Sequence, residues 1–294
     1  MDKRSLTMNE GVDKARRSNI TGASAIVIRP PGRWKSLNLR ELWAYRELLY
    51  FFIWRDIKVR YKQTIVGFAW AIIQPVFMMV VFSLFFGILA KIPSGDVPYP
   101  LFNYAALLPW TLFANGVTRS SNSLVQDVNL VQKIYFPRLL MPISGILSPL
   151  VDFVVAFIIL IGLMLYFGYF PGFLMLLVIP LTILELMLAT GIGLWLSAIN
   201  VQYRDVGYLI PFLIQLLLFA SPVIYSSSFV PPRFQAAYGL LNPMSGIIEA
   251  FRWAILGTTP PGYLIVASVG IIIIILISGI FYFQRRERIF ADVV

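Results

Sequence analysis

The 294-residue sequence contains no cysteine and no histidine. The chain therefore has no disulfide, no thiolate or imidazole metal ligand, no cysteine nucleophile, no Ser-His-Asp triad and no histidine proton relay. Charge is also scarce: 13% of the residues are charged and 59% are hydrophobic. That composition cannot supply the charged shell of a soluble domain. It predicts an all-α membrane protein with no metal site and no catalytic residues of its own.

Positive charge is concentrated in the first 62 residues, which hold 14 Lys and Arg against 6 Asp and Glu within a net charge of +10. No apolar run of the kind found in secretory signals occurs before Thr64. We therefore expect an uncleaved arm on the cytoplasmic side. Residues 1–36 are interpreted as a basic, largely disordered tail because their composition is polar.

Residues 37–62 alternate large apolar residues with cations. One helical face carries Arg55, Lys58 and Lys62, and a neighbouring face carries Trp54, Ile57 and Tyr61. This spacing predicts an amphipathic helix that lies in the membrane interface. By itself the pattern fits two roles equally well: a surface anchor for anionic lipid, or a gate beside an entrance for a lipid substrate.

Six apolar stretches of the sequence are candidates to cross a hydrocarbon core of ~30 Å. The expected spans are 64–90, 97–118, 139–168, 172–199, 206–228 and 263–284. With these spans, 21 Lys and Arg lie on the side of the termini and 3 on the other side. The positive-inside rule then predicts six transmembrane helices with both termini, including the tail 285–294, in the cytoplasm.

The stretch 229–262 is rich in proline and contains two apolar pieces too short to span a membrane. It predicts two short re-entrant helices, near Arg233–Leu241 and Pro243–Gly257, on the outer side. Glu249 and Arg252 have i, i+3 spacing and are placed to pair as an outer gate. An ordinary extracellular loop is the alternative.

Two acids, Asp152 and Glu185, fall near the centres of the third and fourth expected spans. Such carboxylates act as proton relays in some carriers, but they also serve as interhelical hydrogen-bonding groups. A structural role is favoured here, because the sequence shows no intramembrane cation to pair with them.

Aromatic residues are abundant, with 23 Phe, 14 Tyr and 7 Trp. Sugars stack on aromatic rings, so some of these residues are candidates to line a path for a glycan. For any single aromatic, a place in the interface belt or the core is the favoured interpretation. The candidate pore aromatics are Trp70, Phe77, Trp110, Phe219 and Tyr225.

Eight short motifs occur in one order over residues 50–294. They are Arg55–Thr64 with Gly67 and Trp70, Gln74-Pro75, Leu108–Trp110, Ser123–Val125 with Lys133–Arg138, Tyr203–Asp205, Ser221–Tyr225, Leu241–Met244 and Arg285–Val293. Together they resemble the membrane subunit of the ABC-2 class of polysaccharide and polyol-phosphate exporters. Each motif is weak alone, but eight in order are specific.

The resemblance implies a half-transporter that forms a homodimer and binds two copies of a separate ATPase in the bacterial inner membrane, with no nucleic-acid partner. The chain has no Gly-Lys pair and so no phosphate-binding loop, which implies that ATP and Mg are bound by the partner. The implied cargo is a polyprenyl-diphosphate-linked glycan. O-antigen is the leading candidate, teichoic acid and capsule remain open, and a stand-alone secondary carrier is less favoured.

The interfacial cations and the loop 119–138 are the candidate binding sites. Arg55, Lys58, Arg60 and Lys62 are predicted to bind the diphosphate head group, because cation–phosphate hydrogen bonds are charge-assisted. Ser121–Tyr135 is predicted to be a coupling helix, or else a helix that only lies on lipid. Its residues toward the ATPase are the apolar stripe Leu124, Val128 and Val131, with Lys133, Arg204 and Asp205 nearby.

Overall fold

The computed structural model describes residues 39–62, 67–133, 136–287 and 290, and within them every regular element is helical. The chain divides into two units, Met1–Arg40 and Glu41–Val294, and the packed helices belong to the second unit. The predicted tail 1–36 and residues 291–294 lie outside the described residues.

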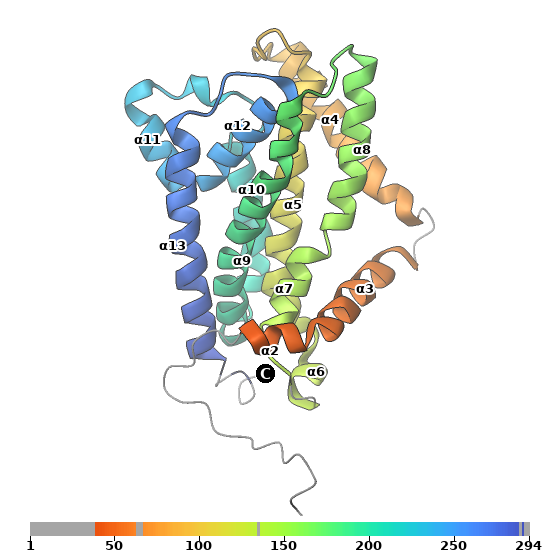
Figure 1. The fold of residues 1–294 in the computed structure, drawn as a ribbon, viewed down its shortest axis with the longest axis vertical. Coiled ribbons are helices and arrows are strands. Elements are labelled where there is room, and N and C mark those ends of the chain that lie inside the picture. Colours follow the sequence, from red (N-terminus) through yellow and green to blue (C-terminus); the bar gives the residue numbers. More distant parts are fainter. Residues whose placement is uncertain (1–38, 63–66, 134–135, 288–289, 291–294) are drawn as a thin grey trace, which may run out of the picture. The chain divides into compact units, whose positions relative to one another are not determined.

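The first half of the described chain contains helices on either side of one long central helix (Figure 1). They are α2 (Leu39–Ala44), α3 (Arg46–Lys62), the 3-10 turn η1 (Gly67–Ala69), α4 (Trp70–Phe82), the π-helical η2 (Ser83–Leu89), α5 (Tyr99–Gln126) and α6 (Val128–Lys133). The second half contains α7 (Leu140–Leu147), α8 (Leu150–Tyr166), η3 (Phe173–Leu177), α9 (Val178–Gln202), α10 (Val206–Ala220), η4 (Ser227–Phe229), α11 (Pro232–Leu241), α12 (Pro243–Leu256) and α13 (Tyr263–Arg286).

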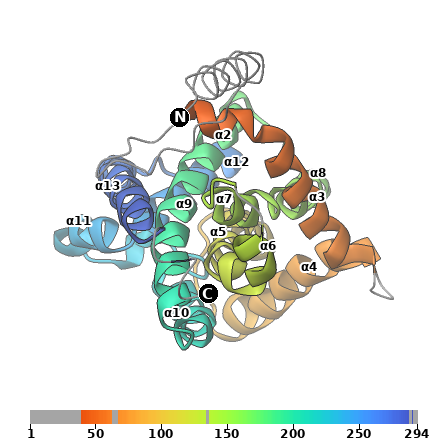
Figure 2. The same ribbon diagram turned by 90° about the horizontal axis from the view of Figure 1, so that it is seen from below.

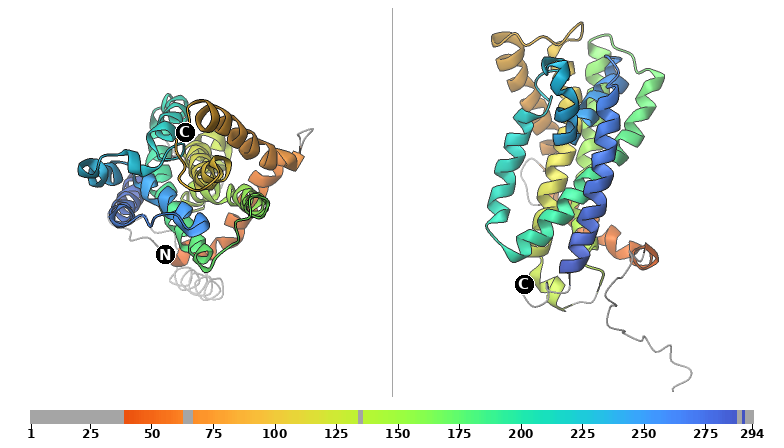
Figure 3. Two further views of the ribbon diagram at one scale, coloured as in Figure 1. Left: turned by 90° about the horizontal axis from the view of Figure 1, so that it is seen from above. Right: turned by 90° about the vertical axis from the view of Figure 1, so that its left-hand side faces the viewer.

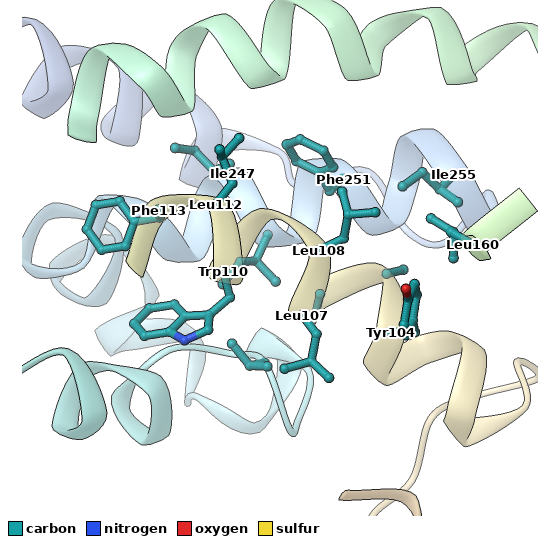
Figure 4. Close-up of a cluster of buried hydrophobic side chains, with 14 of the residues drawn as sticks. Tyr104, Leu107, Leu108, Trp110, Leu112, Phe113, Leu160, Ile247, Phe251 and Ile255 are labelled. Carbon is teal, nitrogen blue, oxygen red and sulfur yellow. The ribbon is translucent and has the colours of Figure 1, made fainter. Parts of the chain in front are cut away.

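The central element is α5, which packs against α4, α7, α8, α9, α10 and α12. Figure 4 shows side chains from α5, α12 and α8 meeting in one apolar cluster, with Leu108, Phe251 and Leu160 among them. These three side chains are at most 2% exposed. Because so many helices surround α5, it is buried along most of its length although its sequence includes many polar residues.

Among the described residues, four helices are long and apolar enough to cross a membrane: Trp70–Leu89, Leu140–Tyr166, Phe173–Gln202 and Tyr263–Arg286. Val206–Ala220 is apolar but shorter. The remaining expected span, 97–118, lies in the buried α5. The chain is therefore a multi-pass membrane protein, and the sequence-based expectation of membrane-spanning α-helices agrees with the structure.

The third expected span corresponds to Leu140–Tyr166, which is long enough to cross a membrane. It consists of α7 and α8, separated at Ser148–Pro149, where proline lacks the N–H needed for the helical ladder. Asp152 lies in the first turn of α8 and, as expected, near the middle of the membrane-crossing stretch Leu140–Tyr166. Likewise, the helix expected over 37–62 is described as α2 and α3, which are separated at Tyr45.

One close helix crossing holds α9 against α13. A Cβ added at Gly279 would lie 2.4 Å from the carbonyl oxygen of Gly191, and one at Gly191 would lie 2.8 Å from the backbone of Ile275. Small residues at a crossing let two backbones approach and pack closely, which stabilises helix pairs in lipid. Trp195 and Tyr282 stack at 4.1 Å further along the same pair of helices.

The helices place two sets of connections at opposite ends (Figures 1 and 3). At one end lie α6, the α9–α10 turn and the C-terminal end of α13, and we call this the α6 end. At the other end lie α11 and α12. Figure 2 shows the α6 end, with α3 passing along one side of α7 and α6.

Candidate functional site

Two cations of α3, Arg55 and Arg60, contact carboxylates outside that helix. Arg55 donates from Nη2 to Oδ2 of Asp127 at 2.5 Å and to Oδ1 of its neighbour Asp56 at 3.0 Å. Burial by itself lowers the pKa of the Arg55 guanidinium, but its hydrogen bonds to Asp127 and Asp56 outweigh burial and raise the pKa. Arg55 is thus a permanent cation in a network of two acids.

Arg60 is held at the start of α8. Its Nη1 and the hydroxyl of Tyr61 both donate to the carboxylate of Asp152. The Nε and Nη2 atoms of Arg60 are buried without a hydrogen-bond partner among the described residues. Arg119 in α5 lies near enough for its charge to interact with that of Arg60. The result is a partly buried cationic site with unused donors.

No pattern in the sequence points to a partner for Asp152, because the two ends of this ion pair are 92 residues apart. In the structure, Asp152 connects α8 to α3 through its ion pair with Arg60. The other two predicted head-group cations are at the surface. Lys58 lies over the ring of Trp54 at 5.2 Å, and Lys62 is exposed.

The predicted coupling helix 121–135 is interrupted. Helix α5 continues to Gln126, Asp127 breaks it with φ −111° and ψ 40°, and α6 begins at Val128. Leu124 is fully buried within α5, so its predicted contact with a partner protein is wrong. Val128 is half-buried and Lys133 exposed, and the side chain of Val131 lies outside what the structure describes.

The α9–α10 turn presents Arg204 and Asp205, both exposed, at the α6 end. An amide contact holds this turn against α5. Asn200 donates from Nδ2 to the backbone oxygen of Ser121 at 2.9 Å and to Oδ1 of Asn122 at 3.1 Å. The predicted surface residues Lys133, Arg204 and Asp205 therefore all lie at the α6 end, where a partner can reach them.

The motifs Lys133–Arg138 and Arg285–Val293 contact each other through Arg138 and Glu287. The backbone N–H of Arg138 donates to Oε1 of Glu287 at 3.2 Å, and its guanidinium Nη1 donates to the Glu287 carbonyl oxygen at 2.6 Å. Phe290 is buried against Phe283 with ring centroids 5.3 Å apart. Sequence analysis missed this contact, although Arg138 and Glu287 each lie in a recognised motif.

The predicted pair in α12 is present as a buried cluster. Arg252 is fully buried and lies 3.4 Å from Oε1 of Glu249. The guanidinium also donates to the carbonyl oxygens of Val223 at 2.8 Å and Tyr225 at 3.0 Å, and lies 3.6 Å from the centroid of the Phe102 ring.

Glu249 completes this cluster by accepting the N–H of Ser227 at 2.7 Å. The pair thereby joins α12 to the loop 221–227 and to α5. Because its charged groups are hydrogen-bonded to one another and to the backbone, the cluster is suited to holding these elements together. The structure therefore favours a role in which Glu249 and Arg252 fasten α12 to the loop 221–227. It does not favour a gate in which the ion pair separates by itself.

The candidate pore aromatics differ in exposure: three are exposed, and Trp110 and Tyr225 are not. Trp70, Phe77 and Phe219 are 50%, 64% and 52% exposed, on α4 and α10. Trp110 is only 4% exposed, and Figure 4 shows it within the core cluster, so its predicted place in a pore is wrong. Tyr225 donates its hydroxyl to the carbonyl of Ala220 at 3.2 Å and helps order the loop after α10.

Glu185 is fully buried in α9 against α5. Neither of its carboxylate oxygens has a hydrogen-bond partner among the described residues. A charged carboxylate in such a place is costly, so this residue is suited to remaining neutral within the packed helices.

Residues 47–256 match the family model described as ABC-2 type transporter. The match covers more than half of the chain. The chain belongs to the ABC-2 type transporter family. The resemblance found from the eight motifs is thereby confirmed, and this ABC-2 chain is a membrane subunit of a transporter.

Curated relatives align with this ABC-2 chain over most of their length. The O-antigen export system permease protein RfbA of Myxococcus xanthus is 28% identical over 254 residues, which cover 85% of this chain and 96% of that protein. A protein of the same name from Klebsiella pneumoniae is 25% identical over 81% of this chain and 92% of its own. The polysialic acid transport protein KpsM of Escherichia coli is 25% identical over 71% and 80%.

Proposed function

We propose that this chain is the transmembrane subunit of an ATP-driven exporter that moves a polyprenyl-diphosphate-linked polysaccharide, O-antigen foremost, across the bacterial inner membrane. The observation that carries the proposal is the similarity to an O-antigen export permease over 96% of that protein's length. The similarity to a polysialic acid transport protein keeps capsular polysaccharide as a second candidate. Teichoic acid is a further alternative, and a stand-alone secondary carrier is less favoured.

We propose further that the chain crosses the membrane six times, with α5 and α10 completing the four longer apolar helices. The α6 end carries Lys133, Arg204, Arg285 and Arg286, whereas the end with α11 and α12 carries Lys91 and Arg233 on its surface. By the positive-inside rule this distribution supports a cytoplasmic α6 end and cytoplasmic termini. In this arrangement α11 and α12 are the two re-entrant helices on the outer side.

The active exporter in this proposal is a homodimer with two copies of a separate ATPase, which binds ATP and Mg. The ATPase docks at the α6 end, on Val128, Lys133, Arg204 and Asp205. The exposed aromatics of α4 and α10 support an arrangement in which these helices face the glycan path or the second copy. One chain alone leaves Trp70, Phe77 and Phe219 half exposed or more.

The diphosphate head group binds at α3 in this proposal. Support comes from Arg60, which keeps two buried guanidinium nitrogens without partners among the described residues. Phosphate oxygens are acceptors that match such a guanidinium. Lys58 and Lys62, at the surface of the same helix, supply further positive charge.

Reconstitution with a separate ABC-type ATPase from the same bacterium tests the proposal. Both proteins are placed in lipid nanodiscs, and ATP hydrolysis is measured with and without a polyprenyl-diphosphate glycan. We expect a stable complex whose hydrolysis rises with the lipid-linked glycan. The matched comparison is the same lipid with a single phosphate and no sugar. A chain that binds no ATPase, or hydrolysis that ignores every lipid-linked glycan, contradicts the proposed function.

A further inference from the structure

Helix α3 touches both ends of the segment that contains α6. Arg55 reaches Asp127, the residue before α6, at 2.5 Å. Phe52, one turn earlier on α3, packs edge-on against Phe136, just after α6, with ring centroids 5.6 Å apart. The Arg55 guanidinium also lies 5.4 Å from the centre of the Phe52 ring. These four side chains form one contact, which we call the α3–α6 joint.

Asp127 occupies a break in the chain. It ends α5 with a backbone that is not helical, and α6 begins at the next residue. A non-helical residue between two helices is a place where one helix can turn relative to the other. Helix α6 is short and makes few contacts with the rest of the described chain apart from α5. The joint therefore limits how far α6 can move without moving α3.

The far end of α3 is fastened to a different helix. Arg60 and Tyr61 both donate to Asp152, in the first turn of α8. Phe52 and Arg55 lie about two turns earlier on the same continuous helix, which runs from Arg46 to Lys62. A displacement of α3 at the joint is thus passed along a rigid helix to α8.

We propose that Asp127 is a positioning residue for transport: through Arg55 it transmits motion of α6 to α3, and α3 passes that motion to α8 through Asp152. The inference rests on the proposed function, because it requires α6 to be moved by a docked ATPase. It assigns Arg55 to mechanical coupling instead of phosphate binding, and leaves Arg60, Lys58 and Lys62 for the head group.

The chemistry of the contact suits this task. An arginine–carboxylate hydrogen bond is charge-assisted and directional, so it resists both separation and sliding. Its two side chains are about 30% and 28% exposed, which leaves the pair only partly screened by water. The aromatic contact beside it adds a second point of attachment, so α6 and α3 move together.

Exchange of the two charges separates the possible roles of Arg55. The variants are Asp127→Asn, Arg55→Gln and the double variant Arg55→Asp with Asp127→Arg. Asp56→Asn is the matched control, because Asp56 also accepts a hydrogen bond from Arg55 but lies on α3 itself. Each is reconstituted with the ATPase, and three quantities are measured: ATPase bound per chain, ATP hydrolysis, and glycan exported per ATP hydrolysed.

We expect Asp127→Asn and Arg55→Gln to keep the ATPase bound and hydrolysing while export per ATP falls about tenfold, the factor that loss of one charge-assisted hydrogen bond produces. The exchanged pair should recover most of the lost export, and Asp56→Asn should resemble the unchanged chain. Recovery by charge exchange is not expected of a phosphate-binding arginine, since aspartate at position 55 repels phosphate.

Three results overturn the joint while leaving the proposed function in place: export per ATP in Asp127→Asn equal to that in Asp56→Asn, loss of bound ATPase from Asp127→Asn, or failure of the exchanged pair to recover. If the unchanged chain itself binds no ATPase, the proposed function falls, and the joint falls with it. The unchanged chain therefore separates the two failures.

Discussion

Arg252 illustrates at the residue scale how a cation is held in the interior of a membrane protein. Its guanidinium has an acid, three carbonyl oxygens and an aromatic ring as neighbours, so its charge and its donors are matched. Removal of one partner from such a cluster leaves buried groups unpaired, which costs more than the whole cluster contributes.

We therefore predict that Arg252→Met lowers the free energy of unfolding by ~3–5 kcal/mol, because Glu249 is left buried without its cation. Thermal unfolding in detergent measures the effect. Arg233→Met is the control, since Arg233 is an exposed cation beside a phenylalanine and should matter little. Similar unfolding temperatures for the two variants would contradict a stabilising role for the cluster.

Leu124 and Val128, which the sequence predicted to lie on one apolar stripe, differ in burial. Leu124 is fully buried in α5, whereas Val128 is half-buried at the start of α6. An aspartate at a core position costs several kcal/mol, because its charge loses water without gaining a partner.

The prediction is that Leu124→Asp reduces the yield of folded chain, while Val128→Asp folds normally and binds less of the proposed ATPase. Size-exclusion profiles report folding, and ATPase that copurifies with a tagged chain reports binding. A folded Leu124→Asp variant that loses the ATPase would restore Leu124 to the docking surface and contradict this assignment.

Packing between elements depends on glycine where backbones touch. At the α9–α13 crossing, a methyl group on Gly279 would overlap the backbone of Gly191. Helix α13 also contains Gly270, around which a Cβ would meet nothing within 4 Å. The two glycines share a helix and differ only in what lies next to them.

We expect Gly279→Ala to destabilise the chain by ~1–3 kcal/mol through overpacking. Gly270→Ala should be neutral or stabilising by up to ~1 kcal/mol, since alanine is the better helix former. Both are read from thermal unfolding under one detergent condition. Equal losses in the two variants would mean that glycine is needed for helix flexibility and not for the close crossing.

The elements themselves were largely predictable, and their breaks were less so. The prolines at 231, 232 and 243 mark the starts of α11 and α12, and those helices agree with the predicted ranges to within a residue or two. The breaks at Asp127 and Ser148–Pro149 were missed. Pro149 is a local reason for the second break, because proline lacks the N–H of the helical ladder. The break at Asp127 has no such local signal, and there Asp127 accepts a hydrogen bond from Arg55 of α3.

For the whole molecule, the absence of native cysteine makes orientation testable with single introduced thiols. Lys133 and Arg204 lie at the α6 end, and Lys91 and Arg233 lie at the opposite end. All four side chains are exposed. A six-span chain with a cytoplasmic α6 end places the two pairs on different sides of the membrane.

In intact cells or spheroplasts, we expect a membrane-impermeant maleimide to label Lys91→Cys and Arg233→Cys. Lys133→Cys and Arg204→Cys should be labelled only after the membrane is broken. Labelling of both pairs from the same side would contradict the six-span topology. The cysteine-free parent chain provides the background.

The sequence by itself determined the class of the protein. Scarce charge, six apolar stretches, the concentration of cations on one set of loops and eight ordered motifs sufficed for an α-helical membrane protein of the ABC-2 family, because these are local or additive properties. It also identified the cations of α3 and the pair Glu249–Arg252, since both lie within short stretches of chain.

Only the tertiary structure decided which of these residues act together. Asp127 with Arg55, Asp152 with Arg60, and Glu287 with Arg138 are separated by 72, 92 and 149 residues, and no periodicity connects such distant charges. Likewise, Trp110 and Leu124 became core residues because other helices surround α5. Ion pairing and burial depend on which helices are neighbours in space, and that neighbourhood exists only once the helices have packed.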